Sequence, residues 1–144
     1  MSFISNFRSA LEKREDKNNL SYDINIETDN ALESIESLVG SHIPRSAKEM
    51  YTAFNGVYIY KPRSFELLNT IDIELFDNRY LIFAVMDIEV RICFDTSCIN
   101  NAGEWDIINY NDKYLITKTL ASFITNKVWA WIDRGRIVWK EERF

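Results

Sequence analysis

The chain has 144 residues, of which 47% are hydrophobic, and a formal net charge of −5. This size and aromatic content predict one domain, residues 1–144, with a buried core, and exclude a disordered chain or a repeat array. The start MSFISNFRSALEKRE mixes charges with apolar residues and no long apolar run follows, so we expect neither a signal peptide nor a membrane partner. Without an export signal, Cys93 and Cys98 are expected to be reduced thiols in the cytoplasm.

Two helices are predicted at the start of the chain. Apolar residues recur at helical spacing, which predicts a helix over residues 2–14 that the charged run EKREDK ends. The second helix begins at Asn30 as N-cap, with Glu33 placed three residues later as in a capping box. Gly40 is the residue type that ends a helix, so this helix is expected to stop there.

A third helix is marked by the stretch IPRSAKEMYTAFNG, residues 43–56. Pro44 fixes φ near the helical value at the start, while Ser46 and Glu49 offer an alternative capping box two residues later. Asn55 and Gly56 tolerate the left-handed conformation in which helices often end, and the β-like run VYIY follows. The stretch therefore predicts a short buried helix that leads directly into a strand.

Strands dominate the middle of the chain. Aromatic, aliphatic or alternating runs predict strands over residues 57–60, 65–68, 80–85, 88–95 and 104–110. Met86 and Asp87 fit a hairpin connection, and residues 100–103 fit a turn. Residues 72–78 are ambiguous between a helical turn and a strand.

The C-terminal part predicts one long helix and a short strand. Thr117 or Thr119 can cap the helix, whose apolar residues keep helical spacing up to Gly135, and residues 136–140 form the strand. The order of these elements predicts an α+β domain. Its sheet is expected to be twisted and mostly antiparallel, with about five or six strands, flanked by the N-terminal helices and the long C-terminal helix.

The tryptophans of the last helix raise a packing question. Trp129 and Trp131 are two positions apart, so both cannot face one core, and we expect at least one near the surface. Such a residue can serve as an interface anchor or can cover the tail at Trp139. The covering role is the favoured interpretation.

Charges are unevenly distributed along the sequence. Residues 18–44 carry five acids and no lysine or arginine, and residues 64–112 carry ten acids and two arginines. These segments have net charges of −5 and −8, so the remainder carries +8 within a total of −5. This polarity argues against a sheet that binds nucleic acid and favours a basic protein partner. An ordinary solvated acidic face is the alternative interpretation.

Few residues suggest catalysis or metal binding. His42 is the only histidine, which leaves no histidine pair for a metal and makes a Ser/His/Asp triad depend on one loop residue. The two cysteines lack further soft ligands for zinc, and the glycines are too dispersed for a phosphate-binding loop. We therefore expect no cofactor, no metal and no catalytic residue, and a protein that is not an enzyme.

Clustered carboxylates are the candidate partner-binding residues. Asp72, Glu74 and Asp77 lie close together in the sequence, and Asp87 and Glu89 lie at the expected hairpin. Carboxylate pairs can act as acid and base, but no nucleophile or oxyanion donor accompanies them. A protein-binding patch or a solvated face is therefore favoured over catalysis.

Several motifs occur in an order that points to a family. Ile43-Pro44, then Tyr51, then Phe54-Asn55-Gly56 matches an LP…F…NG pattern; RICFDTS at residues 91–97, EWDI at 104–107 and LASFITNKV at 120–128 follow. Together they resemble the SUKH superfamily, the Smi/Knr-type glucan-synthesis-regulator-like domains of yeast and many bacteria. The positions that carry this resemblance as structural residues are Pro44, Tyr51, Phe54, Asn55, Gly56, Trp105 and Phe123.

The resemblance implies a binding role. Bacterial SUKH proteins are similar to immunity proteins that neutralise secreted polymorphic toxins, many of them nucleases or deaminases, and yeast relatives look like interaction hubs in cell-wall signalling. We therefore expect an immunity protein that binds a basic toxin domain, or alternatively an interaction module in cell-wall or envelope regulation. Family members often carry a glycine-rich turn where this chain has Met86-Asp87-Ile88.

Overall fold

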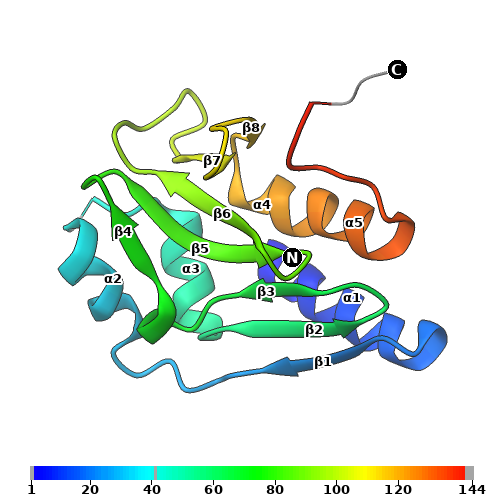
Figure 1. The fold of residues 1–144 in the computed structure, drawn as a ribbon. Helices are drawn as coiled ribbons and strands as arrows, with labels where there is room; N and C mark the ends of the chain where they lie inside the picture. Colours follow the sequence, from blue (N-terminus) through cyan, green and yellow to red (C-terminus); the bar gives the residue numbers. More distant parts are fainter. Residues whose placement is uncertain (1, 41, 142–144) are drawn as a thin grey trace.

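A computed structural model describes residues 2–40 and 42–141, and its helices pack on one face of an antiparallel sheet (Figure 1). Its elements, with η1 a 3₁₀ turn and η2 a π-helical turn, are α1 (Phe3–Asn18), β1 (Ser21–Ile24), α2 (Ala31–Val39), α3 (Arg45–Ala53), β2 (Val57–Lys61), β3 (Phe65–Leu67), η1 (Thr70–Asp72), β4 (Glu74–Phe76), β5 (Tyr80–Met86), β6 (Val90–Asp95), β7 (Asp106–Asn109), β8 (Leu115–Thr117), α4 (Leu120–Ser122), η2 (Phe123–Lys127) and α5 (Val128–Arg134). None of the helices in this part of the chain has the length and apolar surface needed to cross a bilayer.

The sheet has the strand order β1-β2-β3-β5-β6-β7-β8. One edge of β5 is shared, because β3 pairs with its second half and β4 with its first half. The predicted α+β class and antiparallel sheet are confirmed. Within the described residues the sheet has eight strands rather than five or six, because β1, β4 and β8 are too short to give a periodic signal in the sequence. The ambiguous residues 72–78 contain the end of η1, then β4 and part of the following turn.

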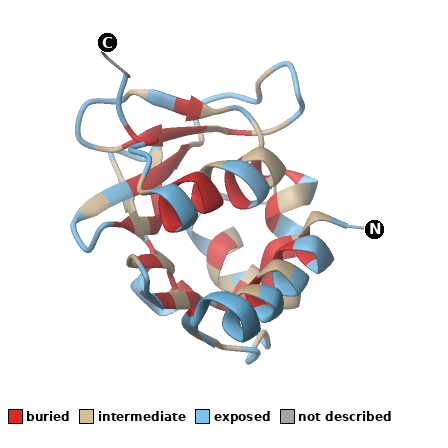
Figure 2. Cartoon of the chain, turned by 90° about the vertical axis from the view of Figure 1, so that its right-hand side faces the viewer, coloured by how far each residue is buried: buried red, intermediate tan, exposed pale blue. Residues whose placement is uncertain are grey.

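The core lies between the sheet and the helices. Figure 2 shows buried residues on the sides of the helices that face inward, and the sheet forms the other layer. Phe83 of β5 stacks on Phe94 of β6 with ring centroids 3.8 Å apart and meets Phe123 of η2 at 5.6 Å. Phe7 of α1 contacts the ring of Phe54 at 6.1 Å. Aromatic rings therefore join η2 to the sheet, and a separate aromatic contact joins α1 to the end of α3.

The two N-terminal helices differ from the prediction in their details. α1 continues through the charged run to Asn18, because glutamate, lysine and arginine are good helix formers, so the predicted end at Arg14 was wrong. Asn19 ends the helix in the left-handed conformation, with φ 55°. Asn30 precedes α2 at φ 66° without a side-chain capping bond, whereas the predicted stop at Gly40 is confirmed.

Asn55 and Gly56 follow the third helix and have different roles in the connection to β2. Gly56 has φ +111°, and a Cβ there would lie 3.1 Å from the Asn69 nitrogen, so glycine is required. Asn55 is not left-handed; its buried side chain instead accepts a hydrogen bond from the Thr70 N–H at 2.8 Å and donates to the Glu27 carbonyl at 3.3 Å. The alternative capping box is not used, since Ser46 donates to Glu104.

The C-terminal helix is capped as predicted, but the tail is not a strand. The Thr119 side chain accepts a hydrogen bond from the Ser122 N–H, and Gly135 ends α5 at φ 65°. Residues 136–140 form no ladder, although Val138 is buried. The Asn109 side chain donates to the Trp139 carbonyl at 2.9 Å, so side-chain contacts hold the tail in place of backbone pairing.

Both tryptophans of α5 are buried, although at least one of them was expected near the surface. Trp129 packs on Phe7 of α1 with centroids 5.6 Å apart, while Trp131 meets Trp139 of the tail at 4.9 Å. The predicted covering role at the tail is confirmed by the second contact. The helix lies between α1 and the tail and therefore has buried residues on more than one side.

Candidate protein-binding surface

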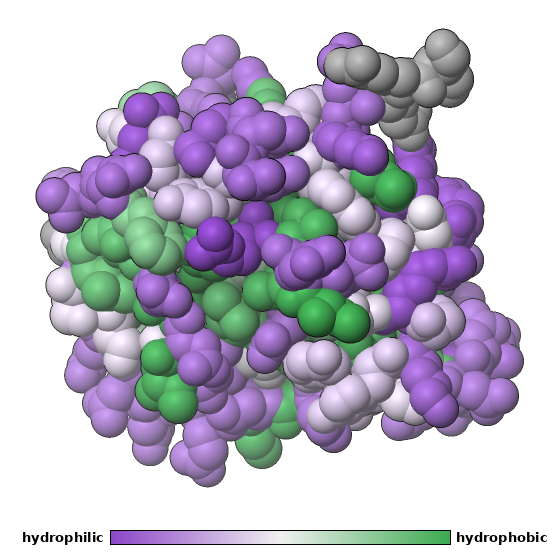
Figure 3. Space-filling view, viewed as in Figure 1, coloured by the Kyte–Doolittle hydropathy of each residue, from purple (hydrophilic) through white to green (hydrophobic). Residues whose placement is uncertain are grey.

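The face of the sheet turned away from the helices is covered by no described helix (Figures 1 and 2), and we refer to it as the open face. The strand registers place five directly paired residues in one row across it: Asp23, Tyr58, Glu66, Val85 and Arg91. Figure 3 shows that hydrophobic side chains gather over the middle of this face between hydrophilic ones. The open face thus combines apolar, aromatic and charged groups, a composition found at protein interfaces.

An aromatic cluster lies on the open face above β5 to β7. The ring of Tyr110 is 5.3 Å from that of Phe76 and 5.9 Å from that of Tyr80, between centroids. Tyr110, which follows β7, thus contacts rings of β4 and β5, which are far from it in the sequence. Beneath them on this face are Ile82 and Cys93, which pair across β5 and β6 and are 3% and 0% exposed. The open face therefore has a small apolar core of its own.

Cations surround these rings. The Arg91 guanidinium carbon lies 4.9 Å from the Tyr110 centroid and the Lys113 ammonium 4.1 Å from the same ring. Arg79 lies 5.1 Å from the Tyr80 centroid and also pairs with Asp95 at 2.9 Å. Cation–π contacts at exposed sites contribute about 0.5–1 kcal/mol each. Although residues 64–112 are acidic overall, the fold brings positive charge to the middle of the open face.

The turn between β5 and β6 carries an exposed apolar side chain in a strained conformation. Ile88 is 80% exposed and has φ +70°, and Asp87 before it has φ +51°. The Glu89 N–H donates to the Asp87 carbonyl at 2.8 Å, which closes a γ-turn around Ile88. A β-branched residue in this region costs about 1–3 kcal/mol. Ile88 thus neither packs into the core nor adopts a relaxed turn conformation.

A shallow hollow of about 50 Å³ lies beside this turn on the open face. It is lined by Tyr58, Ser64, Phe65, Glu66, Val85 and Ile88. Burial, and secondarily the negative charge of Asp72, raises the pKa of Glu66. Glu66 was not predicted as a partner-binding residue, because a single acid in the run FELL gives no cluster signal.

All five predicted partner-binding acids are exposed: Asp72, Glu74, Asp77, Asp87 and Glu89. Among the described residues, none forms a side-chain hydrogen bond or ion pair with their carboxylates. The structure does not bring them into one patch, because three surround β4 and two lie in the β5–β6 turn. Only Asp77 lies in the turn before β5, which is about 20 Å from the β5–β6 turn at roughly 3.3 Å per residue of the seven-residue strand, whereas Glu74 pairs with Ile82 partway along β5.

Other acids of the same segment serve the fold. Asp95 accepts two hydrogen bonds from Arg79, whose guanidinium holds the pKa of this carboxyl at about 2, below its ordinary 3.8. Glu104 accepts hydrogen bonds from the Ser46 hydroxyl and the Leu120 N–H and thereby joins α3 to the start of α4. The exposed acids are therefore the ones that remain available to a partner.

The family-motif residues occupy the interior rather than the open face. Pro44, Tyr51, Phe54, Asn55, Trp105 and Phe123 are buried, and Gly56 forms the sharp exit from α3. His42 is exposed just before α3, and Cys93 and Cys98 are free thiols, the first buried and the second exposed. Burial raises the pKa of Cys93 to about 12. Within the described residues, no group of three or more His, Cys, Asp or Glu side chains is arranged to hold a metal ion.

Comparisons of the chain with protein-family models, with curated proteins and with solved structures gave no significant match.

Proposed function

We propose that this chain is a non-catalytic, protein-binding domain of the SUKH type, an immunity protein that neutralises a basic toxin domain in the cytoplasm. The open face is the observation that carries the proposal. It presents aromatic and apolar side chains that no described helix covers, and exposed carboxylates around β4 and in the β5–β6 turn that the fold does not use.

The middle of the open face has the residue types that contribute most to binding energy. Tyrosine and arginine are enriched among the residues whose truncation weakens protein interfaces most, and Tyr58, Tyr110 and Arg91 lie on this face. Ile88 adds an exposed aliphatic side chain at its margin. A partner that buried about 800 Å² on each side would cover most of these groups together.

The acids around β4 and in the β5–β6 turn give the charge complementarity. A basic partner centred on the open face would bring its own cationic rim close to both acidic groups, which raises the association rate and makes it salt-dependent. For a nuclease toxin, the carboxylates would occupy the places of nucleic-acid phosphates and so block substrate binding without chemistry.

The test is co-expression with the toxin candidate encoded beside this gene, scored by growth rescue, together with association rates of the purified pair. Asp72→Asn, Glu74→Gln, Asp77→Asn, Asp87→Asn and Glu89→Gln are introduced together, and we expect the association rate to fall at least tenfold and to lose most of its salt dependence. The matched control neutralises five other exposed acids: Glu12, Glu15, Asp16, Asp29 and Glu33.

Equal effects of the two five-residue variants would refute the role of the open face, since they change net charge by the same amount. Binding that ignores both salt and the first set would refute it as well. If co-expression of this chain rescues growth from none of the neighbouring toxin candidates, the alternative is favoured, an interaction module in envelope regulation.

A further inference from the structure

One row of paired residues crosses the open face with a regular order of charges, and we refer to it as the central row. From β1 to the end of β7 it consists of Asp23, Tyr58, Glu66, Val85, Arg91 and Tyr110. Lys113 extends the row, because its ammonium donates to the Tyr110 carbonyl and lies 4.1 Å from the centre of the Tyr110 ring. The central row is therefore negative on the β1 side of Val85 and positive on the β7 side.

The two charges next to Val85 are not neutralised within the described residues. Glu66 and Arg91 lie on the strands that flank β5, so at about 4.8 Å between strands their backbones are roughly 10 Å apart. Neither side chain forms an ion pair with a described residue, and Arg91 contacts the rings of Phe76 and Tyr110 instead. Each charge is thus available to an opposite charge from another molecule.

We infer that a second copy of this chain covers the central row, with a twofold axis that runs roughly along β5. Rotation about such an axis exchanges the strands on the two sides of β5, so that Glu66 of each copy faces Arg91 of the other. A twofold axis across the strands would instead place Glu66 on Glu66 and Arg91 on Arg91, and like charges repel one another. The order of charges therefore selects the first orientation.

The outer residues of the central row match in the same orientation. Tyr58 and Tyr110 lie two strands from β5 on opposite sides, so the rotation places the two rings against each other. Asp23, whose carboxylate accepts a hydrogen bond from the Tyr60 hydroxyl, comes to face Lys113 of the second copy. Each half of the row is therefore complementary to the other half.

The middle of this interface is apolar. Val85 lies on the axis and meets its own copy, and Ile88, in the turn at the end of β5, is 80% exposed and comes close to its own copy as well. Sheets that pack face to face lie about 10 Å apart with their strands within about 30° of each other, and side chains fill the space between them. The second copy thus covers the exposed isoleucine.

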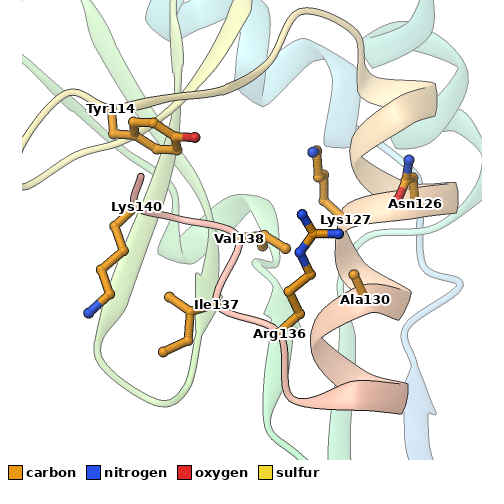
Figure 4. A pocket seen from close by; sticks show the side chains of 8 residues that line it. All are labelled: Tyr114, Asn126, Lys127, Ala130, Arg136, Ile137, Val138 and Lys140. Carbon is orange, nitrogen blue, oxygen red and sulfur yellow. The ribbon is translucent and has the colours of Figure 1, made fainter. Parts of the chain in front are cut away.

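The described part of the tail packs on the helical layer and does not lie over the central row. Trp139 contacts Trp131 of α5, and Val138 lines a hollow together with Lys127 and Ala130 (Figure 4). The inference goes beyond the proposed function and does not rest on it, since it concerns this chain alone. Two copies joined in this way close the open face, so a second copy and another protein would compete for it.

Sedimentation equilibrium of the full chain, at protein concentrations from roughly 1 µM to 1 mM, measures the dimer. We expect a monomer–dimer equilibrium that shifts toward monomer as sodium chloride is added. Glu66→Lys and Arg91→Glu each place like charges opposite one another, and each should weaken the dimer at least about tenfold. The matched controls, Glu12→Lys on α1 and Lys48→Glu on α3, make the same types of charge reversal at exposed residues and should leave the dimer unchanged.

A mixture of the two open-face variants tests the twofold arrangement directly. In the mixed dimer the introduced lysine faces the introduced glutamate, and the remaining Arg91 faces the remaining Glu66, so both pairs are opposite in charge again. We expect the equimolar mixture, and the double variant Glu66→Lys/Arg91→Glu, to regain the affinity of the wild type.

A wild type that stays monomeric at every concentration overturns the inference, and so does a mixture that does not recover. A dimer that the controls weaken as much as the open-face variants overturns it as well. Amide dispersion in NMR spectra verifies that each variant is folded. Where a charge reversal does not fold, Glu66→Gln or Arg91→Gln takes its place, with a smaller expected loss of affinity that a correct inference still requires.

Discussion

The buried side chain of Asn55 gives the sharpest test of how the helix-to-strand connection is held. It accepts a hydrogen bond from the Thr70 N–H at 2.8 Å and donates to the Glu27 carbonyl at 3.3 Å. Asn55 as a whole residue is only 7% exposed. Asn55→Ala removes both bonds. Three segments that are distant in the sequence then lose their common polar contact.

The expected loss follows from the burial of the two groups left behind. Thr70 is 8% exposed, so its N–H cannot reach water and its unsatisfied state costs about 1–3 kcal/mol. The Glu27 carbonyl belongs to an exposed residue and can be hydrated, so its loss adds only about 0.5 kcal/mol. We expect Asn55→Ala to lower the free energy of unfolding by about 2–3 kcal/mol, and Tm by roughly 5–10 °C for a chain of this length.

Urea unfolding followed by tryptophan fluorescence measures this loss, because Trp105, Trp129, Trp131 and Trp139 are all buried in the folded state. Asn69→Ala is the matched control: its side chain accepts one hydrogen bond, from the exposed Ile71 N–H at 3.0 Å, and we expect a loss below about 1 kcal/mol. If the two variants lose the same amount, burial of the Thr70 N–H is not what makes Asn55 important.

Three further predictions concern strain, burial and pH. Tyr51→Phe removes a buried hydroxyl that has no partner among the described residues, so we expect unfolding to cost about 1 kcal/mol more; a less stable variant would show that the hydroxyl is hydrogen-bonded. Ile88→Gly relieves about 2 kcal/mol of strain against about 1 kcal/mol of added chain entropy, so it should stabilise the fold yet weaken binding of the proposed partner, and unchanged binding would exclude Ile88 from the proposed interface. Asp95 has a folded pKa of about 2 against 3.8 unfolded, so its stabilisation is complete above about pH 5 and disappears as pH falls through 2. The difference between wild type and Asp95→Asn in urea unfolding should therefore shrink over that range, and a constant difference would contradict the role of the Arg79 pair.

Local chemistry in the sequence was sufficient to predict the longer elements. The stop at Gly40, the cap at Thr119 and the end at Gly135 depend on interactions within one turn of helix, and the long apolar runs of β5 and β6 carry their own strand signal. The exposure of the five candidate acids also followed from residue type, since unpaired carboxylates are rarely buried.

The remaining features depend on pairing between distant segments. β1, β4 and β8 have three or four residues each and become strands only because a neighbour satisfies their backbone groups. The division of the acids into two groups and the meeting of Arg91 and Lys113 at Tyr110 depend on strand register, which fixes what lies side by side across the sheet. The sequence by itself thus determined the longer helices and strands and the exposure of the five candidate acids. Only the tertiary structure decided which of those side chains share a surface, because proximity across a sheet or between a helix and a tail is not encoded in neighbouring residues.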